Sequence, residues 1–316
     1  NKLVISVGLI VPIGAVFLAF LINYGLLEFI GVLMQPVMKP IWKPPGKSAI
    51  DAVASFVGSY SIGLLITNRV YSEGKYTGKE AAIIATGFST VSATFMIIVA
   101  KTLGLMEMWN FYFWSTLGIT FLVTALTVRI YPLAKKSDLN CYGEEIEDVK
   151  MEGNIFNNAF KAGLNGASKS ESLMINVTTN FIDGFKMAMA ILPSILSIGL
   201  LGLLLAKYTP LFDIAGYIFY PFTYILQLPE PMETAKAITL GIAEMFLPAL
   251  AVKESVEIVR YVVGVVSISS ILFFSASIPC IMSTSIPLNM KDMVIVWFQR
   301  TVLSLIIAGI VAHLFL

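Results

Sequence analysis

The chain has 316 residues, of which 57% are hydrophobic and only 13% are charged, and its mean hydropathy is +0.83. A soluble domain of this length would need far more charge to cover its surface, so the composition predicts an integral membrane protein. The formal net charge of +1 is uninformative about nucleic acid, but no basic tract stands out, so we expect no nucleic-acid partner.

Six apolar segments are long enough to cross a membrane as helices. They cover residues 3–25, 81–100, 109–131, 185–206, 256–278 and 292–316. Continuous apolar runs favour helices, because the strands of a membrane barrel alternate between apolar and polar residues. The chain opens at Asn1 without a methionine, which is compatible with a missing leader or first segment.

Shorter segments between these spans fit a crossing helix badly. Residues 27–47 and 209–231 combine prolines with Lys, Trp or Tyr, a pattern typical of amphipathic helices at the membrane interface. Residues 48–70 and 234–253 are interrupted by Gly, Ser, Pro or charged side chains. We expect these two segments to be re-entrant hairpins, because irregular backbone is tolerated at membrane depth only where protein covers it.

The layout of residues 9–131 recurs in residues 190–316, although few residues are identical. Each half contains an interfacial helix, a re-entrant hairpin, a broken transmembrane helix and a closing apolar helix. Three crossings and one returning hairpin make an odd number, so the halves should be inverted relative to each other. The predicted fold is an all-α integral membrane protein with two inverted Gate-type repeats, residues 1–134 and 182–316, and a linker over residues 135–181.

The distribution of basic residues predicts the orientation of the chain. Fifteen of the 21 Lys and Arg residues fall on the side that holds the first hairpin and the linker. By the positive-inside rule that side is cytoplasmic, and both ends of this chain would lie outside. The linker carries an acidic run at residues 144–148, interpreted as solvated surface, and helical pieces at residues 154–163 and 168–180. We therefore predict a multi-pass protein of the cell inner membrane with a cytoplasmic linker.

The first broken helix begins with Thr77-Gly78-Lys79-Glu80. This spacing predicts a capping box, in which the Thr77 side chain accepts from the Glu80 amide and the Glu80 side chain accepts from the Thr77 amide. The helix is then interrupted by the Ser- and Thr-rich residues 87–94, and residues 267–277 repeat the interruption in the second half. Small residues allow close helix packing without any function. Their recurrence nevertheless favours a shared cavity at the membrane midplane.

Glu244 is the most informative single residue. It lies in the apolar segment GIAEMFLPAL, residues 241–250. A carboxylate at membrane depth is costly, so we expect it to face a cavity, a ligand or a basic partner. The alternative to a functional role is a structural ion pair with Lys236 or Lys253. The matching place in the first hairpin is neutral, Ser59-Tyr60-Ser61, so the predicted site has an acid on one hairpin and hydroxyls on the other.

Other polar residues have simpler interpretations. Arg300 and Gln299 lie early in the last span, where snorkelling of the arginine to the cytoplasmic interface is expected. The only histidine, His313, lies near the end of the chain and is not expected to relay protons. Cys141 and Cys280 occupy unlike surroundings, which argues against a disulfide. We predict no metal site, and the lack of nucleotide-binding and hydrolase motifs argues against an enzyme.

Two stretches carry a resemblance to a known family. The segment GIAEMFLPAL is similar to the Gly-x-x-Glu hairpin of concentrative nucleoside transporters. Residues 75–96, KYTGKEAAIIATGFSTVSATFM, resemble the segment after the hairpin in those proteins. Residues 56–96 look closest to the YjiH-like branch of the nucleoside-recognition, or Gate-domain, superfamily, which also contains ferrous-iron gate proteins and the spore-maturation pair.

The resemblance implies two inverted repeats around a midplane site, a transport role, and assembly with a second copy or another Gate protein. Glu244 matches the hairpin acid that contacts the ligand in the nucleoside transporters. Ser59 and Ser61 occupy the equivalent hairpin of the other repeat, where the Gln-x-Glu pattern of those transporters is absent. Their scaffold domain is also missing from this sequence.

These features predict a secondary transporter, a symporter of a small polar solute of the nucleoside, amino acid or small peptide class, coupled to Na⁺ or H⁺. The predicted solute-binding residues are Glu244, Ser59, Ser61, Ser89, Thr90, Ser269 and Ser270. The predicted coupling-ion residues are Gly87, Ser92, Ser267 and Glu244. The alternative is a Gate-type subunit that does not transport and acts in a complex with another Gate protein. We expect no cofactor besides the coupling ion; the expected partners are the solute, the lipid bilayer, and a second copy or a second Gate-type protein.

The orientation can be tested by cysteine labelling in a background that lacks Cys141 and Cys280. Single cysteines at Ser72 and Lys169 should react with a membrane-impermeant maleimide from the same side, because neither hairpin is expected to cross the membrane. A cysteine at Lys101, predicted on the outer side, should react from the other side. Labelling of the first two positions from opposite sides would rule out the inverted-repeat arrangement.

Overall fold

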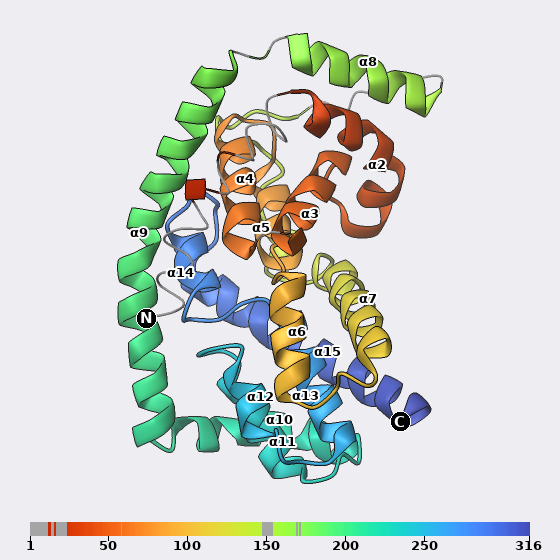
Figure 1. Ribbon diagram of the computed structural model, residues 1–316, viewed down its shortest axis with the longest axis vertical. Coiled ribbons are helices and arrows are strands. Elements are labelled where there is room, and N and C mark those ends of the chain that lie inside the picture. The colour runs from red at the N-terminus through yellow and green to blue at the C-terminus, as the bar shows by residue number, and fades with distance from the viewer. Residues whose placement is uncertain are drawn as a thin grey trace. The chain divides into compact units, whose positions relative to one another are not determined.

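The computed structural model describes residues 12–13, 16, 24–57, 59–146, 154–168, 170 and 172–316. Within these residues every named element is a helix, and no strand is assigned (Figure 1). The predicted all-α class is therefore confirmed. The predicted span over residues 3–25 lies mostly outside the described residues, as do the end of the acidic run and part of the linker.

The helices of the two halves follow the same order along the chain. The first half contains α2 (Leu26–Trp42), η1 (Gly46–Ser48), α3 (Ala49–Val57), α4 (Tyr60–Ser72), α5 (Gly78–Gly87), α6 (Ala93–Thr102) and α7 (Trp109–Thr127). The linker contains η2 (Leu133–Lys135) and α8 (Ile155–Ser168) and leads into the long helix α9 (Leu173–Tyr208). The second half contains α10 (Leu211–Ile225), α11 (Pro231–Leu240), α12 (Leu247–Ala251), α13 (Glu257–Ser269), α14 (Ser277–Met282) and α15 (Met290–Phe315).

This order pairs α2 with α10, the α3–α4 pair with α11–α12, the broken helix α5–α6 with α13–α14, and α7 with α15. The predicted breaks are present, because residues 88–92 and 270–276 separate the two pieces of each broken helix. The inverted relation of the halves, and the return of the hairpins within a membrane, stay predictions.

Capping explains why the first broken helix starts where it does. The Thr77 side chain accepts from the Glu80 amide at 3.1 Å, and the Glu80 carboxylate accepts from the Thr77 amide at 2.9 Å. The predicted capping box is thus confirmed. Asn289 and Asp292 form a second capping box at the start of α15. Such boxes satisfy amides that a helix cannot pair internally.

The chain packs into two compact units. Unit 1 is built from residues 1–89, 128–193 and 280–288, and unit 2 from residues 90–127, 194–279 and 289–316. Each unit draws segments from both halves of the sequence. The division of the chain into repeats 1–134 and 182–316 with a linker over residues 135–181 stays a prediction.

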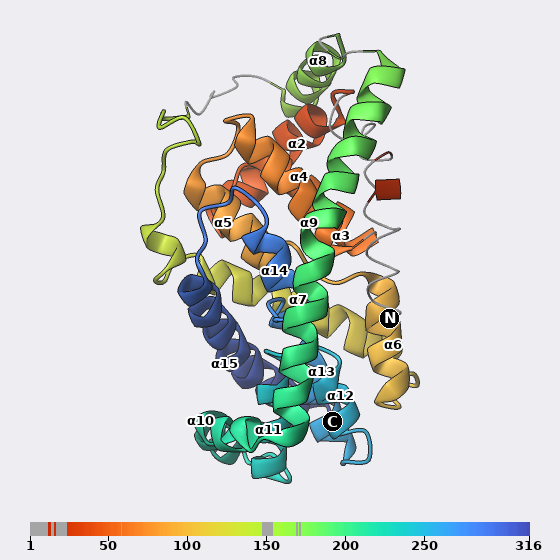
Figure 2. The ribbon, with the colours of Figure 1, turned by 90° about the vertical axis from the view of Figure 1, so that its left-hand side faces the viewer.

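In unit 1, α3 and α4 form an antiparallel helical pair. The Thr67 hydroxyl donates to Asp51 at 2.7 Å, and the Gly63 backbone lies directly against the Ser55 side chain. Residues 51 and 67, like residues 55 and 63, are equally far from residue 59 along the chain. The turn of the antiparallel pair therefore lies at residue 59. A hairpin over residues 48–70 is therefore present. The helix α2, which precedes η1 in the chain, packs against α8. The two helices lie side by side in both ribbon views (Figures 1 and 2).

In unit 2, α7, α13 and α15 pack against one another, and α10 packs against α11. Aromatic contacts hold these helices together, for example Phe111 against Tyr261 with ring centroids 5.4 Å apart and Phe219 against Trp297 at 5.7 Å. The fully buried Tyr112 donates its hydroxyl to the Gly264 carbonyl of α13 at 3.3 Å. The core of unit 2 thus combines apolar packing with buried polar groups.

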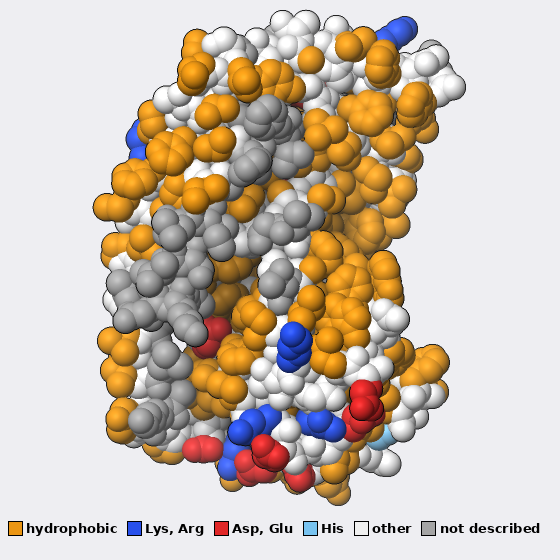
Figure 3. All heavy atoms as spheres, in the orientation of Figure 1, with side chains coloured by type: hydrophobic (Ala, Val, Ile, Leu, Met, Phe, Trp, Pro, Cys, Tyr) orange, Lys and Arg blue, Asp and Glu red, His pale blue; other side chains and the backbone are white. Residues whose placement is uncertain are grey.

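Many large apolar side chains remain on the surface. Trp114, Ile214 and Leu314 are 66%, 64% and 71% exposed. Among the described side chains in Figure 3, hydrophobic ones predominate and charged ones are few. Within the described residues, one helix, Met290–Phe315, is both long and apolar enough to cross a membrane. A surface of this kind is typical of contact with lipid.

The α3–α4 pair yields a packing test. A Cβ added at Gly63 would lie 1.8 Å from the Ser55 hydroxyl oxygen, so Gly63→Ala should lower the free energy of unfolding by about 1–3 kcal/mol through overpacking. The Ser55 hydroxyl has no hydrogen-bond partner among the described residues, so adding Ser55→Ala should restore much of this loss.

The control is Gly118→Ala in α7, where a new Cβ would meet nothing within 4 Å. This change should leave the thermal unfolding midpoint in detergent unchanged or raise it slightly, because alanine favours the helix. Equal loss from both glycine variants, or no rescue by Ser55→Ala, would contradict the packing described for α3 and α4.

Candidate functional site

In unit 2 the tip of the second hairpin meets the second broken helix. The tip is the non-helical stretch 241–246 between α11 and α12, and the break is the stretch 270–276 between α13 and α14. The Phe274 amide donates to the Ile242 carbonyl at 2.7 Å, and the Ser275 amide donates to the Ala243 carbonyl at 3.0 Å. Each irregular stretch thereby satisfies peptide groups that the other exposes.

Glu244 lies at this junction and is half-buried. One carboxylate oxygen accepts a hydrogen bond from the Ser275 hydroxyl, and the other accepts from the Phe246 amide at 3.3 Å. The Ser267 hydroxyl donates to the neighbouring Met245 carbonyl. The structure thus brings Glu244 together with Ser267 and, unexpectedly, with Ser275, whose role the sequence did not single out.

The alternative of a structural ion pair for Glu244 is not supported. Lys236 lies 3.2 Å from Glu233 and 3.5 Å from Asp213, and Lys253 lies 3.6 Å from Glu254. Both lysines are therefore paired with other carboxylates. Among the described residues, the partners of Glu244 are thus a hydroxyl and an amide and not a base.

The first broken helix also reaches this junction, through its second piece. The Phe95 ring of α6 lies 6.1 Å from the Phe246 ring at the hairpin tip, in a T-shaped contact. Ser92 caps α6, because its hydroxyl accepts from the Phe95 amide at 3.4 Å. The N-terminal turn of α6 thus lies beside the tip that carries Glu244. Thr90, just before it, is buried.

The other predicted residues of the second half, Ser269 and Ser270, form hydrogen bonds within their own helix. The Ser269 hydroxyl donates to the Val265 carbonyl at 2.8 Å, and the Ser270 hydroxyl donates to the Ser267 carbonyl at 3.0 Å. Both side chains are buried and bond to their own helix. Their hydroxyls satisfy the end of α13, which is a structural role.

Arg300 corrects the prediction of a snorkelling side chain, because it is completely buried. Its guanidinium donates to the Ser269 carbonyl at 2.9 Å, to the Thr124 hydroxyl at 2.9 Å and to the Thr120 carbonyl at 3.3 Å. No carboxylate of the described residues forms an ion pair with it. Arg300 is therefore a fixed cation at the C-terminal end of α13, where exposed carbonyls carry partial negative charge.

A row of threonines on α7 lies beside Arg300, which donates to two of its members. The buried residues of this row are Thr116, Thr120, Thr124 and Thr127. Their hydroxyls donate to carbonyls one turn back in α7, at distances of 2.6, 2.7, 2.8 and 3.0 Å. On α15 the hydroxyls of Thr301 and Ser304 are buried without a partner among the described residues. The spacing of the threonines by four, four and three residues, which places them on one face of a helix, was the sequence signal for this row of buried hydroxyls.

In unit 1, the predicted residues Ser59 and Ser61 meet each other at the turn of the α3–α4 pair. Their hydroxyl oxygens lie 2.7 Å apart, and Ser61 is buried at the start of α4. Gly87 ends α5, and the buried Ser89 hydroxyl donates to the Ile84 carbonyl at 3.4 Å. Convergence of these residues with Glu244 on one solute stays a prediction.

The first hairpin also contains a buried acid, which lies outside the neutral stretch Ser59-Tyr60-Ser61 and was not among the predicted site residues. Asp51 of α3 is completely buried, and its carboxylate accepts from the Thr67 hydroxyl at 2.7 Å and from the Tyr76 hydroxyl at 2.9 Å. An acid within an otherwise apolar nine-residue helix was the available signal. Each hairpin therefore carries a carboxylate held by hydroxyl donors.

Comparison with known proteins identifies the family. Residues 4–106 match the family model described as Gate, nucleoside recognition. An uncharacterized protein of Alkalihalophilus pseudofirmus is 34% identical over 320 residues, which cover 100% of this chain and 67% of that protein. The chain belongs to the nucleoside-recognition, or Gate, family. The predicted membership of the Gate superfamily is thereby confirmed.

The chain is also similar to part of one further curated protein and, more distantly, to two solved structures. The sporulation integral membrane protein YlbJ of Bacillus subtilis is 29% identical to this Gate protein over 119 residues, or 35% of this chain and 28% of YlbJ. Two structures of the transporter CNTnw, one outward-facing and one inward-facing with substrate, have a TM-score of 0.49. They are 14% and 15% identical, covering 98% and 97% of this chain and 76% and 74% of theirs.

The contacts of Arg300 can be tested by a conservative change. Arg300→Lys keeps the charge but cannot reach three acceptors on two helices, so buried acceptors lose partners at about 1–3 kcal/mol each. The thermal unfolding midpoint in detergent should fall by several degrees. Arg129→Lys is the control, because Arg129 is exposed and also bonds to carbonyls, those of Ile41 and Pro40. Equal effects of the two changes would contradict a special role for burial.

Proposed function

We propose that this Gate protein is a secondary transporter of a small polar solute, with Glu244 as the central binding group. The observation that carries the proposal is the position of Glu244 at the junction of a hairpin tip and a broken helix, held by the Ser275 hydroxyl rather than by a base. Transporters commonly bind their substrates where discontinuous helices expose peptide groups. The nucleoside, amino acid and small peptide classes all offer donors to such a carboxylate.

Each part of the junction has a distinct task in this proposal. The carboxylate accepts hydrogen bonds from hydroxyl or amino groups of the solute. Ser275 keeps the carboxylate oriented between solute-binding events, and the N-terminal turn of α6 supplies a positive end for an acceptor on the same solute. The half-buried state of Glu244 leaves it reachable while limiting competition from water.

The coupling ion follows from the charges around the two breaks. A sodium ion prefers hydroxyl and carbonyl oxygens, which both breaks contain. Arg300 already donates to the Ser269 carbonyl at the end of α13, and its positive charge disfavours a second cation there. We therefore propose that Na⁺, if it is the coupling ion, binds near residues 87–92, with Gly87 and Ser92 as ligands. If the coupling ion is H⁺, Glu244 or Asp51 carries it.

The second candidate function is a Gate-type subunit that does not transport and acts with another Gate protein. The name of the Bacillus subtilis relative favours it, because that protein is described by its part in sporulation. Reconstitution separates the two candidates, since a transporter moves its solute when it is the only protein in the liposome.

The test variant for the transport proposal is Glu244→Gln. The amide fills the same space and no buried base is stranded, so the unfolding midpoint should change little or rise. Solute binding and uptake should fall by orders of magnitude, because the junction loses its charge. Binding is measured first by a thermal-shift screen of nucleosides, amino acids and dipeptides with and without Na⁺, and uptake then with the hit in liposomes.

Glu254→Gln is the matched control, because Glu254 is an exposed acid of the same unit. It should leave binding and uptake intact. Full uptake by Glu244→Gln would remove Glu244 from the site, and uptake by neither the native chain nor the control would favour the subunit. Uptake by the native chain that requires Na⁺ and is indifferent to a pH gradient assigns sodium as the coupling ion, whereas uptake that requires a pH gradient and is indifferent to Na⁺ assigns protons.

A further inference from the structure

A basic pocket lies in unit 1, away from Glu244 in the sequence and in a different unit. Its volume is about 580 Å³, and it lies between the end of α2, the start of α5 and the stretch that follows α7. Its basic lining residues are Lys39, Lys43, Lys47, Lys75, Lys79 and Arg129. The carboxylates among its lining residues are Glu80 and Asp138. Six cations therefore face two acids, and the pocket has an excess of positive charge.

Both acids are engaged by other groups. Glu80 accepts from the Thr77 amide in the capping box, and Asp138 pairs with Lys79 at 3.0 Å. The Lys47 ammonium is held in place by the Lys75 carbonyl at 2.6 Å. Lys75 also pairs with Glu73 at 2.7 Å. The lining cations still outnumber these acids, and the excess positive charge suits an anion with several acceptor oxygens, because ammonium groups bind phosphate as point charges.

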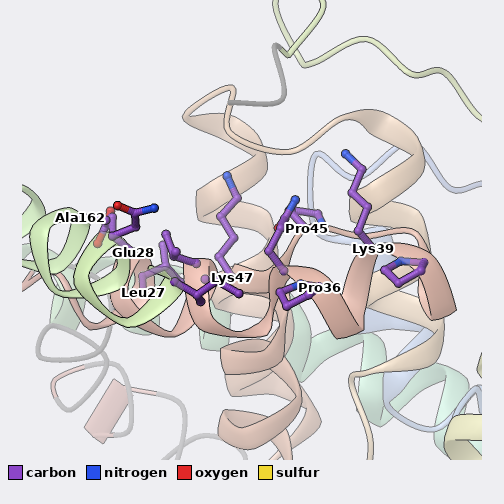
Figure 4. Close-up of a pocket in the computed structure, with 13 residues that line it drawn as sticks. Leu27, Glu28, Pro36, Lys39, Pro45, Lys47 and Ala162 are labelled. Atoms are coloured by element: carbon purple, nitrogen blue, oxygen red, sulfur yellow. The ribbon is translucent and has the colours of Figure 1, made fainter. Parts of the chain in front are cut away.

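An apolar groove adjoins the pocket and shares Lys39, Pro45 and Lys47 with it. The groove has a volume of about 650 Å³ and runs between α2 and α8. Figure 4 shows Lys39 of α2 and Lys47 of η1 projecting in the same direction, with Leu27 and Ala162 farther from Lys39. The groove is therefore cationic at one end and apolar along its length.

The single carboxylate that lines the groove supports a direction for the bound molecule. Glu28 lies beside Ala162, at the end opposite to Lys39 (Figure 4). An anionic group is repelled there and attracted at the lysine end. The surface of α8 next to the groove is also apolar, because Phe156, Phe160 and Leu164 are 59%, 55% and 56% exposed.

We propose that unit 1 binds an anionic phospholipid, with the phosphate headgroup in the basic pocket and an acyl chain in the groove between α2 and α8. A soluble phosphate would use the basic pocket but leave the groove empty, whereas a phospholipid matches both. The basic residues belong to the side predicted to be cytoplasmic. Basic pockets on that side of membrane proteins bind anionic headgroups.

The experiment uses the purified full chain in a neutral detergent and counts bound lipid by native mass spectrometry. Phosphatidylglycerol is titrated in one arm, phosphatidylcholine in the second, and glycerol 3-phosphate in the third. We expect binding of phosphatidylglycerol and much weaker binding of the other two. The variant Lys39→Gln/Lys43→Gln should weaken phosphatidylglycerol about 25-fold, since each lysine near an anionic lipid contributes about fivefold. Ala162→Phe, which fills the groove, should weaken phosphatidylglycerol without changing binding of glycerol 3-phosphate.

The matched control is Lys161→Gln/Lys291→Gln, which removes two exposed lysines outside the pocket. It should leave lipid binding unchanged, and melting curves in lipid-free detergent should show that all variants are folded. Equal binding of both phospholipids, equal loss in the control, or unaltered binding in both test variants would overturn the proposal. Tight binding of glycerol 3-phosphate alone would replace the lipid with a soluble phosphate.

Discussion

The structure depends on one constraint, which is that a helix broken in an apolar environment must find partners for the peptide groups that it exposes. At the second break the partners come from the hairpin tip, through the bonds of Phe274 and Ser275 to the carbonyls of Ile242 and Ala243. These bonds fix the tip against the break. Because Glu244 lies on that tip, the same bonds that satisfy the backbone also place the carboxylate.

The sequence predicted the features that depend on neighbouring residues. The Thr77–Glu80 capping box, both helix breaks and the unusual acid Glu244 on a short apolar segment follow from local spacing, and the first two are confirmed. Arg300 could not be predicted in the same way. Its acceptor Thr124 lies 176 residues earlier in the chain, and hydropathy gives no sign that a span buries its arginine rather than extending it to the interface.

Asp51 shows a second limit of the same kind. The sequence predicts a solvent-exposed side chain for a lone acid in a helix of nine residues. The donors that make the burial of Asp51 possible lie 16 and 25 residues away along the chain. Once α3 and α4 pack in antiparallel fashion, Thr67 and Tyr76 reach its two oxygens. The acid thus contributes to the hairpin instead of disrupting it, since a buried carboxylate is tolerated when donors surround it.

Arg300 and Glu244 have different roles around the second helix break. Arg300 donates hydrogen bonds to the C-terminal end of α13 and to α7. Because Arg300 is part of the chain, these bonds break only if the helices separate. A bound sodium ion at the same carbonyls would instead come and go with the transport cycle. The end of α13 is therefore a permanent part of the scaffold. In the proposed transport cycle, the group that exchanges partners would be Glu244, which is half-buried and held by a single hydroxyl and a single amide.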